Sequence, residues 1–148
     1  MQIEIAPRSR RIERPGYVWI AVILEVLTGI LALPVGWSFI QDPTGSSLGL
    51  PQGWIESTMF GSYLIPGIYL LVMNGLAMIA VAALSIRRDW IAPWLTGALG
   101  VGLIIWIAVE IGTLPETMVL TWVFLAIGFA LGFIALFWLR RTEQLLLW

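Results

Sequence analysis

Histidine, cysteine and lysine are absent from the sequence, and charged residues of all kinds make up only 11% of it. Without histidine or cysteine, the chain cannot build a Cys/His zinc site, a thiol–disulfide relay, a histidine-ligated haem or a nucleophile paired with either residue. Without lysine it cannot form a Schiff base. We therefore expect a non-enzymatic protein with no catalytic residue, no metal site and no cofactor.

Apolar residues, by contrast, make up 59% of the 148 residues, which is too many for an ordinary soluble domain of this size. Four stretches reach the roughly 20 residues that a helix needs to cross a bilayer. They cover residues 17–39, 63–86, 90–113 and 117–139. Turn-forming segments separate the four stretches. The segment "LALPVGWS" in the first stretch has no signal-peptide cleavage pattern, so we expect this span to be retained in the mature protein. The sequence predicts an all-α bundle of four transmembrane helices in one domain, residues 17–139.

The arginines are gathered at one set of span ends. They lie before the first span, between the second and third, and after the fourth: Arg8, Arg10, Arg11, Arg14, Arg87, Arg88, Arg140 and Arg141. By the positive-inside rule we expect both termini to be cytoplasmic. We also expect the protein to lie in the plasma (inner) membrane. Residues 1–16 then form an Arg-rich cytoplasmic arm that can touch anionic lipid headgroups, and residues 140–148 form a cytoplasmic tail.

The connection between the first and second spans is the only long one. It covers residues 36–62 on the exoplasmic side, where Pro51 can open a short helix. We expect this structured exoplasmic loop to cap the bundle, with a lid or a docking surface for a partner as the alternative.

Glu25 is a carboxylate inside the first span. A helical wheel places it with Thr28 and small residues, namely Ala21, Gly29, Ala32 and Gly36, on one face of that helix. Small and polar residues on one face indicate a packing interface inside a bundle. An unpaired polar group in hydrocarbon costs several kcal/mol, so we predict that Asn74 or Thr28 hydrogen-bonds the Glu25 carboxyl. Glu25 is then a structural group or a site that handles protons or cations.

Glu110 lies near the other end of the third span, close to Tyr69 and the long loop. Counted along the helices, it is about 18 Å from Glu25 in depth, which argues against a direct pair of acids. We treat Glu110 and Tyr69 as a candidate site on the outer side.

Two pairs of small residues have the spacing of helix-packing motifs. Gly128 and Gly132 are four residues apart in the fourth span, as are Ala98 and Gly102 in the third. This spacing lets helix backbones approach closely, either within the bundle or between two protomers.

Two stretches of the sequence resemble known families. "QDPTGSSLGLPQGWIESTMFGSYLIPGIYLL", followed by "RRDW" and "GLIIWIAVEI", resembles a family of small bacterial four-span membrane proteins of unknown function, in which a glutamine is expected at position 110. "YVWIAVILEVLTG" is similar to the first helix of small multidrug resistance transporters. That resemblance implies that Glu25 binds protons and cationic drugs in competition, but it ends after the first span.

The sequence favours one function, listed first below, and leaves two alternatives open. The first is an accessory or assembly subunit of a membrane complex, with the lipid bilayer, membrane proteins or a second copy as partners and no nucleic acid. The second is a proton-coupled exporter of apolar cations that uses Glu25. The third is lipid or quinone binding between the helices.

Overall fold

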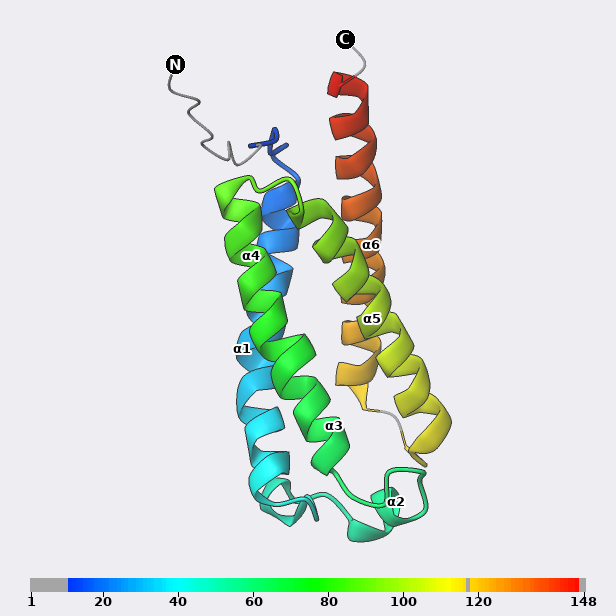
Figure 1. Ribbon diagram of the computed structural model, residues 1–148. Helices are drawn as coiled ribbons and strands as arrows, with labels where there is room; N and C mark the ends of the chain where they lie inside the picture. Colours follow the sequence, from blue (N-terminus) through cyan, green and yellow to red (C-terminus); the bar gives the residue numbers. More distant parts are fainter. Residues whose placement is uncertain (1–10, 117, 147–148) are drawn as a thin grey trace, which may run out of the picture.

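The structure, a computed structural model, describes residues 11–116 and 118–146 and contains four helices long and apolar enough to cross a membrane (Figure 1). The first, third and fourth spans are α1 (Val18–Gln41), α5 (Ala92–Thr113) and α6 (Val119–Leu146). The second span is built from three segments in succession: α3 (Leu64–Tyr69), the π-helical η2 (Leu70–Ala77) and α4 (Met78–Arg87). The predicted all-helical, four-span architecture is confirmed, and it is that of a multi-pass membrane protein.

The fourth helix is longer than the hydropathy pattern indicates. The sequence places its end at residue 139, but α6 continues to Leu146 and takes up most of the predicted tail, residues 140–148. Residues 140–146 contain no glycine or proline, so nothing in this segment stops the helix. The first ten residues of the predicted arm, the predicted helix start at Thr117 and the last two residues of the tail lie outside the described residues.

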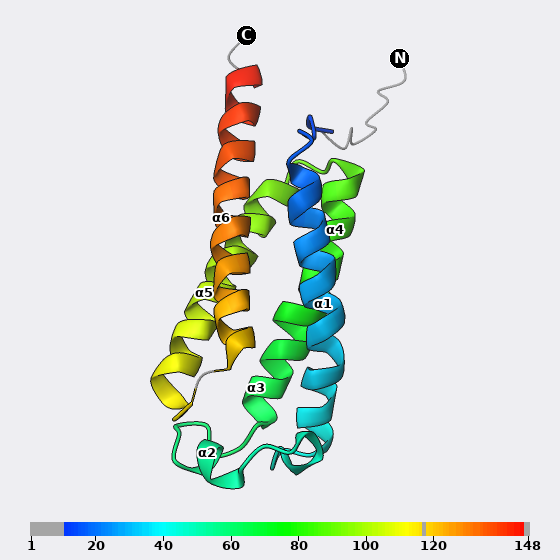
Figure 2. The ribbon, with the colours of Figure 1, turned by 180° about the vertical axis from the view of Figure 1, so that it is seen from behind.

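The bundle consists of two closely packed helix pairs, which we call pair A (α1 with α3, η2 and α4) and pair B (α5 with α6). Both views show α1 beside the second span and α5 beside α6 (Figures 1 and 2). Glycines allow the close approach in each pair. A Cβ atom on Gly36 would lie 2.6 Å from the backbone nitrogen of Leu71, and one on Gly100 would lie 2.9 Å from the carbonyl oxygen of Gly128.

The two pairs are held together at the end of the bundle where α1 begins and α6 ends. Val18, Val22, Ala82, Ala92 and Trp138 form a buried apolar cluster there. The indole Nε1 of Trp138 donates to the carbonyl of Glu13 at 2.9 Å, and the exposed ion pair Arg141–Glu13 lies nearby. The backbone of the arm is thereby attached to α6.

The opposite end is covered by the connection between α1 and α3. This segment contains η1 (Ser46–Leu48) and α2 (Gln52–Glu56), which starts directly after Pro51, as the sequence predicts. Its core is Tyr63, whose ring stacks on Phe39 at 4.7 Å, together with buried Ile55. The loop is thus an ordered cover over one end of the bundle.

Asp42 organises the beginning of this loop. Its carboxylate accepts hydrogen bonds from the hydroxyls of Thr44 and Ser46 and from the backbone N–H groups of Thr44 and Ser47. The Thr44 hydroxyl, followed by the other donors, holds the pKa of the Asp42 carboxyl well below its usual range. An ionised Asp42 therefore fixes the turn that leads out of α1.

Candidate functional site between the helix pairs

A cavity of about 410 Å³ separates pair A from pair B in the half of the bundle nearer the loop. Its walls come from all four spans and from the loop, and most of the lining side chains are aliphatic or aromatic. The large aromatic ones are Phe39, Trp54, Phe60, Tyr63, Trp106 and Phe124. Its volume falls in the range of small-molecule sites, which are concave, mainly apolar and equipped with a few polar groups.

The deep end of the cavity has polar groups at the middle of the bundle. Thr28 of α1 and Asn74 of η2 line it there, and both side chains are almost fully buried. Within the described part of the chain, the Thr28 hydroxyl has no hydrogen-bond partner, and neither has the hydroxyl of Tyr63 nearer the loop. Buried hydroxyls normally have a partner, so these two are free to bind a polar group of a ligand.

The π-helical segment η2 carries Asn74 at this deep end. A π-helical turn is wider than an α-helical one and is found frequently at functional sites. The glycine beside it, Gly75, packs against Leu33 of α1, so the turn is held against pair A. The hydropathy pattern of an uninterrupted span gives no indication of this segment.

The mouth of the cavity has a second polar group. The Oε1 atom of Glu110 accepts a hydrogen bond of 2.7 Å from the hydroxyl of Thr121, and both residues line the cavity. Tyr69, which we grouped with Glu110, has a different partner: its hydroxyl donates to the carbonyl of Gly102 at 3.0 Å, and its ring stacks on Trp106 at 4.3 Å. Glu110 therefore belongs to the cavity wall, whereas Tyr69 packs behind Trp106.

Glu25 lies beyond the deep end of the cavity and does not line it. Its side chain has no exposed surface, so it faces protein as predicted. The hydrogen bond it makes is different from the predicted one: Oε1 accepts at 2.7 Å from the hydroxyl of Thr96 on α5, which is also fully buried. The predicted partner Thr28 makes no such bond, and none is formed by Asn74 among the described residues. Both of these side chains lie on the cavity instead.

The depth of Thr96 in the membrane, counted along its helix, already identifies it as a possible partner of Glu25. Counted from the predicted span ends, Thr96 lies about 9 Å into the third span and Glu25 about 12 Å into the first, closer than the roughly 18 Å of Asn74. Thr96 also shares a helical face with Leu99, Leu103 and Ile107, all of which are buried. The bond joins pair A to pair B in the half of the bundle nearer the arginines. The cavity separates the pairs in the half nearer the loop.

The predicted packing residues behave differently from one another. Gly128 is buried against α5, where a Cβ would lie 2.8 Å from Cγ1 of Ile104. Gly132 has open space where a Cβ would be, Ala98 is exposed, and Gly102 faces the Tyr69 hydroxyl. The partner of Gly128 on α5 is Gly100, which the four-residue spacing of Ala98 and Gly102 does not reveal.

The chain matches no protein family, curated protein or solved structure in comparisons with each.

Proposed function

We propose that this chain is a non-enzymatic membrane protein that binds a lipid-like or quinone-like molecule in the cavity between its helix pairs. The observation that carries this proposal is the cavity itself, with an apolar wall and polar groups at both ends. An amphiphile with an apolar body fits this lining, because its polar groups can bond with Thr28 and Asn74 at the deep end or with the Glu110–Thr121 pair at the mouth.

The two unpartnered hydroxyls support a ligand that carries oxygen atoms. Thr28 and Tyr63 can each donate a hydrogen bond to a carbonyl or ester oxygen, and Trp106 and Phe124 add aromatic surface to the lining for a flat or chain-like body. Membrane-soluble molecules of these kinds reach such a cavity from the bilayer. If both termini are cytoplasmic, as the arginines favour, the cavity belongs to the outer half of the membrane.

The exporter hypothesis stays a prediction with one structural requirement. Glu25 is fully buried, does not line the cavity and is one helical turn from Thr28, which does. A cation that entered the cavity would meet the Glu25 carboxyl only after the helices around Thr28 had moved. The cavity as it stands therefore supports binding more directly than proton-coupled transport.

An accessory role in a larger membrane complex also stays a prediction. Gly128, which we considered for association between chains, is occupied inside the bundle by Ile104. Gly132, the other residue of that hypothesis, has open space where a Cβ would be, so a contact with another protein can use the surface at Gly132 but not the one at Gly128. Ligand binding and membership of a complex are compatible, since a lipid-binding subunit can serve a larger assembly.

The test is a cavity-filling substitution. Ala32 is buried and lines the cavity, so Ala32→Leu puts a larger side chain into it, whereas Ala98→Leu makes the same change on an exposed helix face. Each variant is purified in a mild detergent, and native mass spectrometry records the small molecules that remain bound. We expect a stoichiometric molecule on the wild type and on Ala98→Leu that is lost or strongly reduced on Ala32→Leu. Equal retention by all three proteins, or no bound molecule on the wild type, would contradict the proposal.

A further inference from the structure

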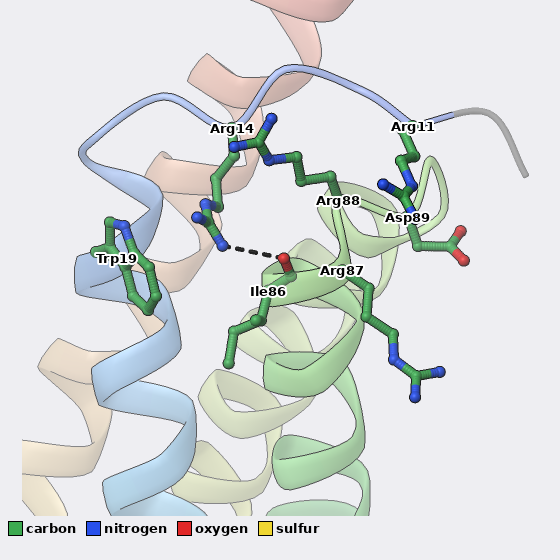
Figure 3. A pocket seen from close by; sticks show the side chains of 7 residues that line it. All are labelled: Arg11, Arg14, Trp19, Ile86, Arg87, Arg88 and Asp89. Carbon is green, nitrogen blue, oxygen red and sulfur yellow. Dashed lines mark hydrogen bonds between the residues drawn. The ribbon is translucent and has the colours of Figure 1, made fainter.

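Four arginines line a hollow at the end of the bundle opposite the long loop, where the arm meets the turn between α4 and α5. The hollow has a volume of about 730 Å³ and is lined by Arg11, Arg14, Arg87 and Arg88, with Asp89, Trp19 and Ile86 (Figure 3). Figure 3 shows Arg11 and Arg14 coming from the arm and Arg87 and Arg88 from the end of α4. Two separate segments of the chain thus contribute arginines to the lining of one hollow, although the Arg87 side chain points away from Arg14 and Arg88 (Figure 3).

The arm is fixed against the turn by its backbone. Arg11 and Asp89 form an antiparallel bridge, and the N–H of Ile12 donates to the carbonyl of Arg88 at 3.0 Å. The positive-inside rule accounts for the number of arginines at this end, but it does not require a backbone bridge that draws them together.

Arg14 is also held in position. Its Nη1 donates to the carbonyl of Ile86 at 3.0 Å, and its guanidinium lies 4.3 Å from the centre of the Trp19 ring. One nitrogen is occupied by this bond, so the remaining N–H donors of a planar guanidinium stay available on the hollow.

Arg88 occupies a backbone position that usually belongs to glycine. It follows the last residue of α4 with φ of 60°, in the left-handed region that closes many helices. Arginine adopts this conformation at a cost that glycine avoids. A residue other than glycine is uncommon in this region, and strained residues of this kind cluster at ligand sites.

The charge in the hollow is unbalanced. Asp89 is the single carboxylate among the lining residues, and its Oδ1 already accepts the N–H of Ile91. Within residues 11–116 and 118–146, none of the four arginines is in an ion pair. Four guanidinium groups with a single carboxylate among them carry a net positive charge that attracts anions, and their fork of donors matches phosphate oxygens.

We propose that this hollow binds a phosphate-bearing anion, and that the anion is the headgroup of an anionic phospholipid. The apolar part of the lining favours the lipid, since Trp19 and Ile86 are about half exposed, at 45% and 48%, and continue from the hollow onto the bundle surface. Acyl chains can lie along that surface while the phosphate contacts Arg14 and Arg88. A free phosphate ion would use the same guanidinium groups without the apolar contact.

The test compares two double variants that remove the same charge from the same end of the bundle. Arg14→Gln/Arg88→Gly takes two guanidinium groups from the hollow and gives the left-handed position its preferred residue, which protects folding. Arg140→Gln/Arg141→Gln removes two exposed arginines that do not line the hollow, and the Arg141–Glu13 pair that it breaks is an exposed one of 3.8 Å, a kind that contributes little to stability. The delipidated full chain is titrated with phosphatidylglycerol and with phosphatidylcholine, and native mass spectrometry counts the bound lipids.

We expect the wild type to prefer phosphatidylglycerol over phosphatidylcholine. At about 1 kcal/mol per arginine, the hollow variant should bind phosphatidylglycerol about 30-fold more weakly, while the Arg140/Arg141 variant keeps nearly the wild-type affinity. Equal binding of the two lipids by the wild type, or equal losses in both double variants, would overturn the lipid assignment.

Inorganic phosphate separates the two sources of the anion. Thermal unfolding is measured in phosphate and in chloride at equal ionic strength. One outcome would keep the phosphate site but assign it to a free ion. In that outcome phosphate raises the unfolding midpoint of the wild type but not of Arg14→Gln/Arg88→Gly, and the wild type shows no lipid preference. No lipid preference together with no effect of phosphate would refute the site altogether.

Discussion

The bond between Thr96 and Glu25 should be a measurable link between the two helix pairs. Donor and acceptor are 2.7 Å apart, and both side chains are fully buried. Thr96→Val replaces the hydroxyl by a methyl group of nearly the same shape, so it removes the donor with little change in packing or helix propensity. The carboxyl then loses the one partner that the described residues give it.

The size of the effect follows from measured hydrogen bonds. Leaving a buried acceptor unsatisfied costs about 1–3 kcal/mol in soluble proteins, whereas double-mutant cycles inside membranes average about 0.6 and reach about 1.7 kcal/mol. With both partners fully buried, we expect Thr96→Val to lower the free energy of unfolding by about 1–2 kcal/mol, a factor of roughly 5–30 in the equilibrium. Glu25→Gln keeps an oxygen that can accept from Thr96, so it should change stability by less than about 0.5 kcal/mol.

Thr28 provides a matched control on the same face as Glu25. It is also almost fully buried, but its hydroxyl has no partner among the described residues, so Thr28→Val removes an unsatisfied group. In protein freed of any bound ligand, we expect this variant to be as stable as the wild type or more stable.

The assay is unfolding in mixed micelles with increasing dodecyl sulfate, followed by tryptophan fluorescence. A double-mutant cycle with Glu25→Leu isolates the pair, because Thr96→Val should cost almost nothing once the acceptor is gone. Equal effects of Thr96→Val and Thr28→Val, or a coupling energy of zero, would refute the assigned bond.

Two further predictions concern packing and the loop. A Cβ on Gly36 would meet backbone atoms of the second span, whereas one on Gly132 would meet nothing within 4 Å. In the same unfolding assay, Gly36→Ala should therefore destabilise by about 1–3 kcal/mol and Gly132→Ala should be neutral or stabilising by up to about 1 kcal/mol; similar values for the two would contradict the close packing of pair A. The carboxyl of Asp42 has its pKa lowered by Thr44 and the neighbouring donors, so its stabilising contribution is present above the ordinary aspartate pKa of about 3.9 and is lost as the pH falls through the lower, folded value. Carbon NMR of labelled protein should find Asp42 still ionised at pH near 4, and a midpoint at the ordinary value would show that the turn is not formed.

The arrangement along each helix was largely predictable from the sequence. The inward face of α1 follows from the distribution of small and polar residues, and Ala21, Glu25, Thr28, Gly29, Ala32 and Gly36 are all buried. The second span has a similar face on a helical wheel, and it is buried as well except for Leu71, which is partly exposed; its residues are Gly67, Leu71, Asn74, Gly75, Met78, Ala82 and Ser85. Bulky aliphatic residues on the remaining faces leave only one surface suited to close packing, so the pattern has a physical cause.

The arrangement between helices was less predictable, and the errors arise there. The wheel places Glu25 inward but does not say which helix faces it. We predicted Asn74 of the second span or Thr28 of the same helix as its partner, whereas Thr96 of α5 makes the bond. The spacing of Gly128 and Gly132 treats the two glycines alike, although a Cβ on Gly128 would meet α5 and one on Gly132 would meet nothing within 4 Å. Neighbour relations depend on the tilt and rotation of whole helices, which packing determines and a single helix does not record.

The cavity was the feature least accessible from the sequence. Its lining residues come from four spans and a loop, and each of them has an ordinary place in its own helix or turn. The cavity arises because the two helix pairs are joined by the Glu25–Thr96 bond in one half of the bundle and separate towards the loop in the other half. Thr28 and Asn74 were singled out as polar partners for Glu25, and their actual position on the cavity gives them a different significance.

The most direct test of ligand binding is photo-crosslinking from two positions on α6. Phe124 lines the cavity, whereas Phe129 is exposed on the helix surface, so benzoylphenylalanine at each position samples the cavity and the surrounding lipid separately. After irradiation in native membranes, mass spectrometry identifies the attached molecules. Our account predicts that position 124 captures one lipid-like or quinone-like species far above its share of the membrane, while position 129 captures the bulk lipids in their ordinary proportions. The same mixture of lipids at both positions would contradict it.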